Sequence, residues 1–228
     1  MPKALFLFEH LGYAAQPFTE DGWTTIIVDT DNTEDNPRAT HTLNWDIWES
    51  EEKLIDLAQG SEFIFAFPPC THLTGTGAAH FQKKRQADAQ VHLDAVHLLR
   101  SAERIGNAAG VPWAIENPVG LASSLWRKPD KVFSPWQYGR YLPPDDRHPD
   151  FPYYIPPRDA YTKRTCIWHS PDFIWPQMRW LEKPKGGAWA ASLLGGKNQR
   201  TARIRSASPR GFFLALFQAY TEHLEKGA

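Results

Sequence analysis

The sequence predicts an α/β protein built on a doubly wound, mostly parallel sheet. Short apolar runs alternate with helical stretches from residue 4 to residue 116, which is typical of consecutive strand–helix–strand units. The run 62–67 is aromatic and β-branched and ends at two prolines, as expected of a strand buried on both faces. The stretch 83–109 repeats apolar residues at steps of three and four, which indicates a helix with one apolar stripe.

The elements follow in chain order from the same patterns. Strands are expected at 4–8, 23–28, 62–67, 111–116 and 164–169, and a short mixed segment lies at 42–48. Helices are expected at 13–21, 51–59 and 83–109, the last two closed by Gly60 and Gly110. The polar stretch 30–40 is expected to be a loop. A final helix is predicted with Ser208 as its N-cap and Pro209 at its first helical position.

Length and composition fit a single domain with ordered insertions. The 228 residues suffice for a sizeable core, and segments 121–162 and 170–200 are rich in proline and aromatic residues with little periodicity. A net charge of −1 gives no global field toward nucleic acid. The two cysteines, Cys70 and Cys166, require no disulfide, so we expect a reduced, cytoplasmic setting. No stretch is long and apolar enough to predict a membrane span.

Three strand ends carry side chains that could take part in catalysis. Cys70 follows the strand at 62–67, Glu116 ends the strand at 111–116, and Arg164 opens the strand at 164–169. Ligands bind at the carboxyl ends of strands in open α/β sheets. Taken singly, Cys70 could be an inert buried thiol, and Glu116 could cap the turn that follows it.

Together, these motifs resemble those of the cytosine-5 DNA methyltransferases. Pro68-Pro69-Cys70-Thr71, Glu116-Asn117-Pro118-Val119-Gly120 and the Arg164 strand occur in the family's order, with separations of 46 and 48 residues. The closer likeness is to small, phage-type members of this superfamily. The resemblance covers most of the chain and implies a sheet of the class I methyltransferase (Rossmann-like) type. It also implies a cytoplasmic location in a bacterial or phage-infected cell.

The resemblance implies a role for each residue at these strand ends. The Cys70 thiolate would attack carbon 6 of cytosine, and the activated carbon 5 would take a methyl or related group. Glu116, kept protonated, would donate to ring nitrogen 3, and Arg164 would hold the carbonyl oxygen at carbon 2. Pro69, Thr71, Asn117 and Pro118 would line the base pocket. The target base would be flipped out or already single-stranded.

The resemblance also implies S-adenosyl-L-methionine as the cofactor. The residues at the corresponding positions are Glu9, His10, Gly12, Asp29, Asp46, Ile47 and Pro68. Asp29 directly follows a strand and could take both ribose hydroxyls; it could also be a simple turn residue. His92 and His97 have no carboxylate at ligand spacing, and no metal is expected.

DNA is the expected partner. Arg200, Arg203 and Arg205 lie in a dense basic segment without acidic residues, which could contact phosphates or form a solvated loop. Only 38 residues separate Arg164 from Arg203, so 121–162 and 170–200 would form a small target-recognition region. The chain could therefore require a homo-oligomer or an accessory protein, or act on a free pyrimidine nucleotide. A third alternative is an inactive methyltransferase fold that binds DNA or another protein.

Overall fold

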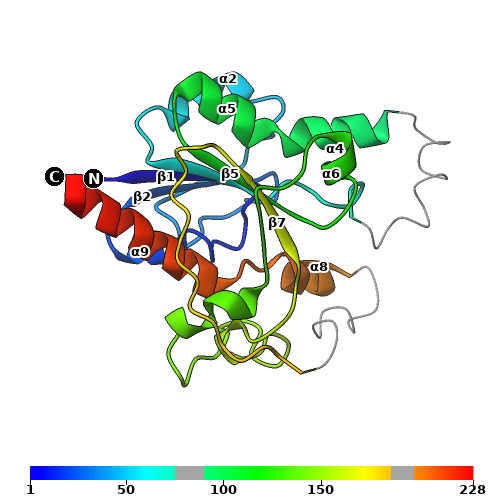
Figure 1. Cartoon of the computed structure of the whole chain (residues 1–228). Coiled ribbons are helices and arrows are strands. Elements are labelled where there is room, and N and C mark those ends of the chain that lie inside the picture. The colour runs from blue at the N-terminus through cyan, green and yellow to red at the C-terminus, as the bar shows by residue number, and fades with distance from the viewer. Residues whose placement is uncertain (75–89, 186–197, 228) are drawn as a thin grey trace. The chain divides into compact units, whose positions relative to one another are not determined.

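The computed structural model describes residues 1–74, 90–185 and 198–227. These residues form two compact units (Figure 1). The first unit comprises Met1–Val132 and Thr165–Phe173, and the second comprises Phe133–Arg164 and Ile174–Ala228. The first unit contains nearly the whole sheet, and it therefore contains every candidate residue that follows a parallel strand.

Seven strands form one sheet in the order β3-β2-β1-β4-β5-β7-β6. Their bounds are β1 Lys3–Leu7, β2 Thr24–Val28, β3 His41–Leu43, β4 Phe63–Ala66, β5 Trp113–Pro118, β6 Lys131–Phe133 and β7 Thr165–His169. The pairs among β1 to β5 are parallel, whereas β5 and β7 are antiparallel. The order is that of the dinucleotide-binding sheet with one antiparallel strand inserted beside β5. The predicted fold class is confirmed.

The central strands are buried on both faces because alternate side chains pack on opposite sides of the sheet. One face packs against α2 (Glu51–Ala58), α4 (Val91–Leu99) and α5 (Ser101–Ala109), and Figure 1 shows α2 and α5 lying along it. Its core includes Leu5, Leu7, Ile26, Val28, Ile64, Ala66, Leu54, Ala102 and Ile105. The other face is aromatic: Phe6, Phe63 and Trp23 surround Phe18 of α1 (Gln16–Glu20), and Phe173 packs on Phe63.

The predicted helix at 83–109 is interrupted. Residues 83–89 lie outside the described residues, and the remainder forms two helices that meet at Arg100. The Arg100 amide donates to the carbonyls of both Val96 and His97, at 3.1 and 3.2 Å, and its ψ of 6° departs from the helical value. The apolar stripe continues across this break, and Gly110 ends α5 in the left-handed conformation as predicted.

The second unit is built on short helices and aromatic packing. Its helices are η2 Pro135–Tyr141, η3 Pro157–Asp159, α8 Gln199–Ser206 and α9 Arg210–Gly227. Phe212 of α9 stacks on Phe133 and contacts Tyr138 and Trp175. The last helix begins one residue later than predicted, because the Pro209 carbonyl accepts its first hydrogen bond, from Phe213. None of the described helices has the length and apolar character that crossing a bilayer requires.

Candidate functional site at the carboxyl edge of the sheet

Four candidate residues lie at or beyond the level at which the parallel pairings stop. The register pairs Leu7 with both Val28 and Ala66, and Ala66 with Ile115. Glu9, Asp29 and Cys70 follow strands that end at this level. Glu116 lies next to Ile115 but inside β5, which continues to Pro118 and does not end at Glu116 as predicted. All four residues lie in the first unit.

Cys70 lies in a tight turn directly after β4. The Phe67 amide still donates to the Leu7 carbonyl, and Pro68-Pro69 then stop the ladder because neither proline can donate. The Cys70 carbonyl accepts the amides of Leu73 and Thr74, both at 2.9 Å. Its side chain is half-buried, and neither cysteine forms a disulfide. The turn thus presents the thiol at the edge of the sheet instead of burying it in the core.

The Cys70 turn is joined to the segment that ends β5. Asn117 is wholly buried, and its Nδ2 donates to the Pro68 carbonyl at 2.9 Å. Thr74 forms an antiparallel bridge with Gly120. The Leu121 amide donates to the Leu73 carbonyl at 2.7 Å. We call this set of contacts between residues 68–74 and 117–121 the loop clamp.

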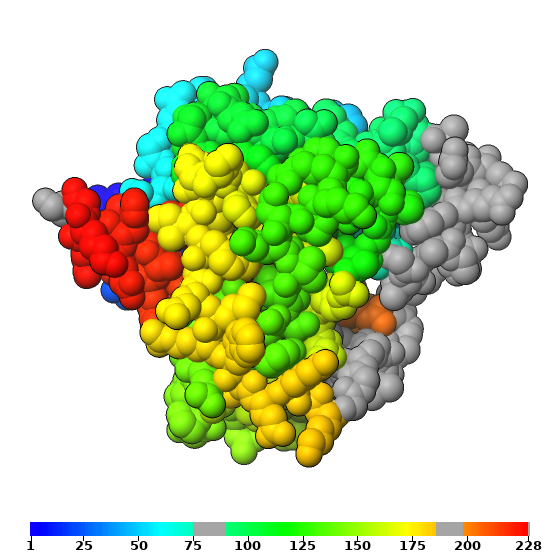
Figure 2. Space-filling view, in the orientation of Figure 1, coloured from blue at the N-terminus to red at the C-terminus, as the bar shows by residue number. Residues whose placement is uncertain are grey.

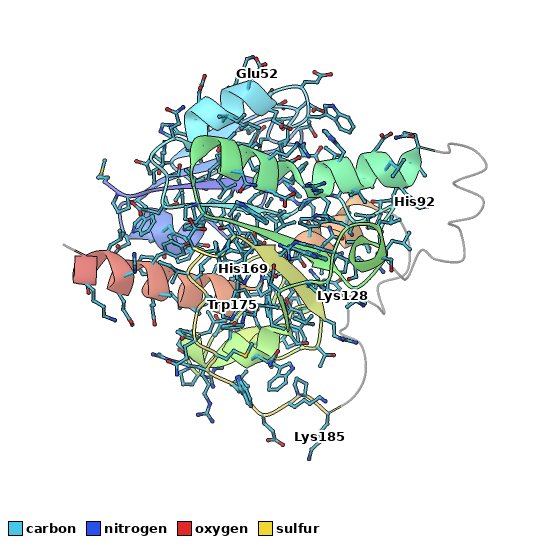
Figure 3. The ribbon with its side chains drawn as sticks, turned by 45° about the horizontal axis from the view of Figure 1, so that its top comes forward. Glu52, His92, Lys128, His169, Trp175 and Lys185 are labelled. Carbon is cyan, nitrogen blue, oxygen red and sulfur yellow. The ribbon has the colours of Figure 1, made fainter. Side chains whose placement is uncertain are left out.

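Gly120 is required by the loop clamp. A Cβ atom at this position would overlap the Leu73 carbonyl oxygen, and the Cα of Thr74 would lie 3.0 Å away. Only glycine allows the two backbones to approach so closely. On the helical side, His92 of α4 (labelled in Figure 3) adds a further tie, since its Nδ1 lies 2.8 Å from the His72 carbonyl. His92 must donate this hydrogen bond because a carbonyl oxygen can only accept.

Glu116 lies within β5 where this strand pairs with β7. Glu116 pairs with Ile167, its side chain is half-buried, and its Oε1 is buried. Because β7 runs antiparallel, it begins beside the end of β5, where Thr165 pairs with Pro118. Figure 2 shows the green segment around β5 bordering the yellow segment that contains β7. Arg164 immediately precedes Thr165, is exposed and belongs to the second unit, so its place at the base stays a prediction.

The first turn of the expected cofactor site is organised by Glu9. Phe8 has a φ of 57°, an uncommon conformation for a residue with a side chain. Glu9 is then buried, and its Oε1 accepts the Gly12 amide at 2.6 Å. A Cβ atom on Gly12 would lie 2.8 Å from the Arg38 Cβ and 3.0 Å from the Asn36 amide group. Gly12 therefore permits this turn to pack on the loop at 36–38.

Asp29 is the residue that best fits a cofactor ribose. Its side chain is only 16% exposed at the end of β2, and burial raises the pKa of its carboxyl group. Oδ1 accepts the Asp31 amide at 2.8 Å, and Oδ2 lies 4.0 Å from Nδ1 of His10. A desolvated carboxylate in this position favours hydroxyl donors such as a ribose diol. His10, Asp29 and Asp31 also offer ligand atoms within 4.8 Å of one another, a spacing that could hold a metal ion.

Asp46 and Ile47 organise the turn into α2. Oδ1 of Asp46 accepts the amides of Trp48 and Glu49, at 2.8 and 3.1 Å, so one carboxylate oxygen is committed to the turn. Ile47 is buried in the core. Trp48 stacks on His97 with ring centroids 3.9 Å apart. Burial, and then the neighbouring Arg104, lower the pKa of His97.

The basic segment is helical in the structure. Arg200, Arg203 and Arg205 lie on α8, and all three are exposed. The helix is capped by Asn198, whose Oδ1 accepts the Thr201 amide at 2.8 Å. The segment is therefore a helix and not a loop, whereas the contact of its arginines with phosphates stays a prediction. Sequence periodicity missed the helix because only Thr201 and Ile204 of its eight residues are buried.

The second unit also brings Lys163 to α8. Its Nζ donates to the Arg205 carbonyl at 3.3 Å, near the C-terminus of the helix, where a cation is favoured. This contact sets the residue that precedes Arg164 beside the basic helix, a proximity that the sequence did not predict. The basic surface is thus formed by two distant segments.

The comparisons with known proteins identify no family for this chain. No family model matches the chain, and no curated protein matches it. The solved structures that are similar to part of it include a UDP-glucose-4-epimerase from Stenotrophomonas maltophila with bound NAD and formylated UDP-arabinopyranose. The likeness has 15% sequence identity and a TM-score of 0.33, and it covers 49% of this chain and 35% of the epimerase chain. The fold assignment therefore stands on the strand order of this chain.

Proposed function

We propose that this protein transfers a methyl or related group from S-adenosyl-L-methionine to carbon 5 of cytosine in DNA, through a covalent adduct with Cys70. The observation that carries the proposal is the loop clamp. It joins the cysteine turn to the Glu116-Asn117 strand end by two hydrogen bonds and a backbone bridge. A nucleophile that attacks carbon 6 and an acid that protonates nitrogen 3, on the opposite side of the same ring, require such fixed mutual placement.

Cys70, Glu116 and Arg164 each have a different role in this reaction. The Cys70 thiolate forms a bond to carbon 6, and the displaced electron pair moves into the ring while Glu116 supplies a proton to nitrogen 3. S-adenosyl-L-methionine, when bound, supplies the electrophilic group that carbon 5 accepts. A base then removes the proton from carbon 5, the thiolate departs, and nitrogen 3 returns its proton to Glu116, which restores the aromatic ring. The cofactor would leave as S-adenosyl-L-homocysteine. By resemblance, Arg164 holds the carbonyl oxygen at carbon 2.

The cofactor assignment is supported by Asp29 and by the buried Glu9. Asp29 offers a half-buried carboxylate at the end of β2, where the ribose of a bound nucleotide lies in sheets of this order. Glu9 fixes the first turn through the Gly12 amide. We propose that the cofactor is also contacted by the backbone of Asp46 and Ile47 and by the ring of Pro68.

The test is transfer of a labelled methyl group by the full chain. Cys70→Ser is expected to abolish transfer while leaving the melting temperature and the affinity for S-adenosyl-L-methionine near wild type. Cys166→Ala, at the buried cysteine of β7, is the matched control and is expected to retain transfer. Full activity of Cys70→Ser would refute covalent catalysis.

The acceptor is settled by the same assay. DNA, single-stranded DNA and free deoxycytidylate are offered in parallel, and the product nucleosides are identified by mass spectrometry. We expect label in a 5-substituted cytosine of DNA. Label only in the nucleotide would assign the same chemistry to a smaller substrate. Cofactor binding that is undetectable by calorimetry would instead favour a protein that uses this fold only for binding.

A further inference from the structure

Tyr153 is an aromatic side chain presented to solvent on an anchored turn. Its side chain is 95% exposed. The amides of Tyr154 and Ile155 both donate to the Phe151 carbonyl, at 3.0 and 2.9 Å. The Phe151 amide donates in turn to Nδ1 of the buried His148, on which the Phe151 ring stacks. The tyrosine therefore extends from a turn fixed on both sides, so holding it for a ligand costs little conformational entropy.

The turn adjoins the basic helix of the same unit. The guanidinium of Arg200 lies over the ring of Tyr154, 4.9 Å from its centroid. Arg200 shares α8 with the exposed Arg203 and Arg205, and residues 197–210 contain no acidic side chain. Single exposed aromatic residues are common on protein surfaces. Tyr153 differs because its immediate neighbour, Tyr154, already contacts Arg200, the first arginine of α8.

We propose that Tyr153 stacks on an unpaired base of DNA whose phosphates lie along the arginines of α8. The inference rests on DNA being the partner in the proposed function, and it adds a base contact that the resemblance does not assign. Cationic side chains beside an aromatic platform are the usual way to hold single-stranded nucleic acid without reading its sequence. The two contributions differ physically, because phosphate contacts weaken with salt and stacking needs a base.

This difference gives a direct test by fluorescence anisotropy on the full chain. The probes are a labelled oligothymidylate and an abasic oligonucleotide of the same length, each titrated over a series of salt concentrations. Tyr153→Ala is expected to weaken oligothymidylate binding about 5- to 100-fold with an unchanged salt slope. It is expected to leave abasic binding unchanged. Tyr153→Phe, which keeps the ring, is expected to bind like wild type.

A charge variant supplies the complementary result. Arg203→Gln is expected to weaken binding of both probes and to reduce the salt slope by roughly one. Lys226→Gln, an exposed charge on α9 outside the expected target-recognition region, is the control and is expected to leave both unchanged. Melting temperatures confirm that each variant is folded.

The outcomes separate this inference from the proposed function. If Tyr153→Ala binds oligothymidylate as tightly as wild type, or loses equal affinity for the abasic probe, base stacking by Tyr153 is wrong, whatever the transfer assay shows. If wild type binds neither probe, DNA contact by this surface is overturned. In that case Cys70-dependent transfer to a free nucleotide would still be measurable.

Discussion

Asn117 is the residue whose replacement tests the loop clamp most directly. Its side chain is wholly buried and its Nδ2 gives the Pro68 carbonyl a hydrogen bond of 2.9 Å. Asn117→Ala removes the donor and leaves that carbonyl unsatisfied, at a cost of about 2 kcal/mol in the free energy of unfolding. Asn117→Asp should cost more, because it places a carboxylate oxygen against the carbonyl oxygen in a buried position.

The assay combines urea denaturation with thiol labelling. Without the tie to Pro68, the turn that presents Cys70 loses its fixed geometry, so we expect a changed rate of reaction with a disulfide reagent. Cys166 is 2% exposed and should react only when the chain unfolds, which gives an internal reference. Asn44→Ala is the matched control, since this exposed asparagine also donates to a backbone carbonyl, and its loss should cost under about 0.5 kcal/mol.

One combined result would overturn the role given to Asn117. If Asn117→Ala unfolds within about 0.5 kcal/mol of wild type and the labelling rate of Cys70 does not change, the hydrogen bond to Pro68 does not organise the cysteine turn. The loop clamp would then have to depend on its backbone contacts alone.

Three further predictions concern stability. Gly120→Ala must displace a backbone carbonyl and should lower the unfolding free energy by about 1–3 kcal/mol, whereas Gly227→Ala meets nothing within 4 Å and should be neutral in denaturation. Burial raises the pKa of Asp159 from 3.8 to about 6. The protonated carboxyl group therefore stabilises the fold below about pH 4, and up to about 3 kcal/mol of unfolding free energy should be lost as the pH rises through about 6. Thermal melts of Asp159→Asn should not show that loss. Arg104→Met removes the ion pair with Glu51 and should cost about 1 kcal/mol, and a smaller cost at low than at high salt would contradict an ionic origin.

The central sheet could be predicted because its strands are short, unbroken and mostly apolar runs. β4 is buried throughout, and β2 is buried except at Thr24. Such continuous burial leaves a direct signature in the sequence. The edge strands have no such signature. β6 spans three residues, of which only Phe133 is buried, and it was not expected. The antiparallel direction of β7 also has no periodicity of its own, because both kinds of strand alternate in the same way.

The sequence could predict which candidate residues lie at the same edge of the sheet, because the strand ends set their positions. Cys70 and Glu116 lie at the same edge because the carboxyl ends of parallel strands coincide. The contacts that join them depend on the conformation of two loops, and a buried Asn117 or a close approach at Gly120 has no local pattern. The only sequence feature that could have indicated this close approach was the glycine at position 120, which follows Asn-Pro-Val. The helix that bears Arg203 lacked an apolar stripe because little of it is buried.

The late position of β7 in the chain has a consequence for synthesis on the ribosome. β5 ends at Pro118, and its partner begins only at Thr165, after the segment 133–164 of the second unit has been made. Until then, Trp113, Ala114 and Ile115 form the open edge of the nascent sheet. An open edge of apolar residues is a template for pairing with other chains. A chain truncated before Thr165 should therefore aggregate even though four parallel pairings of the sheet are already encoded.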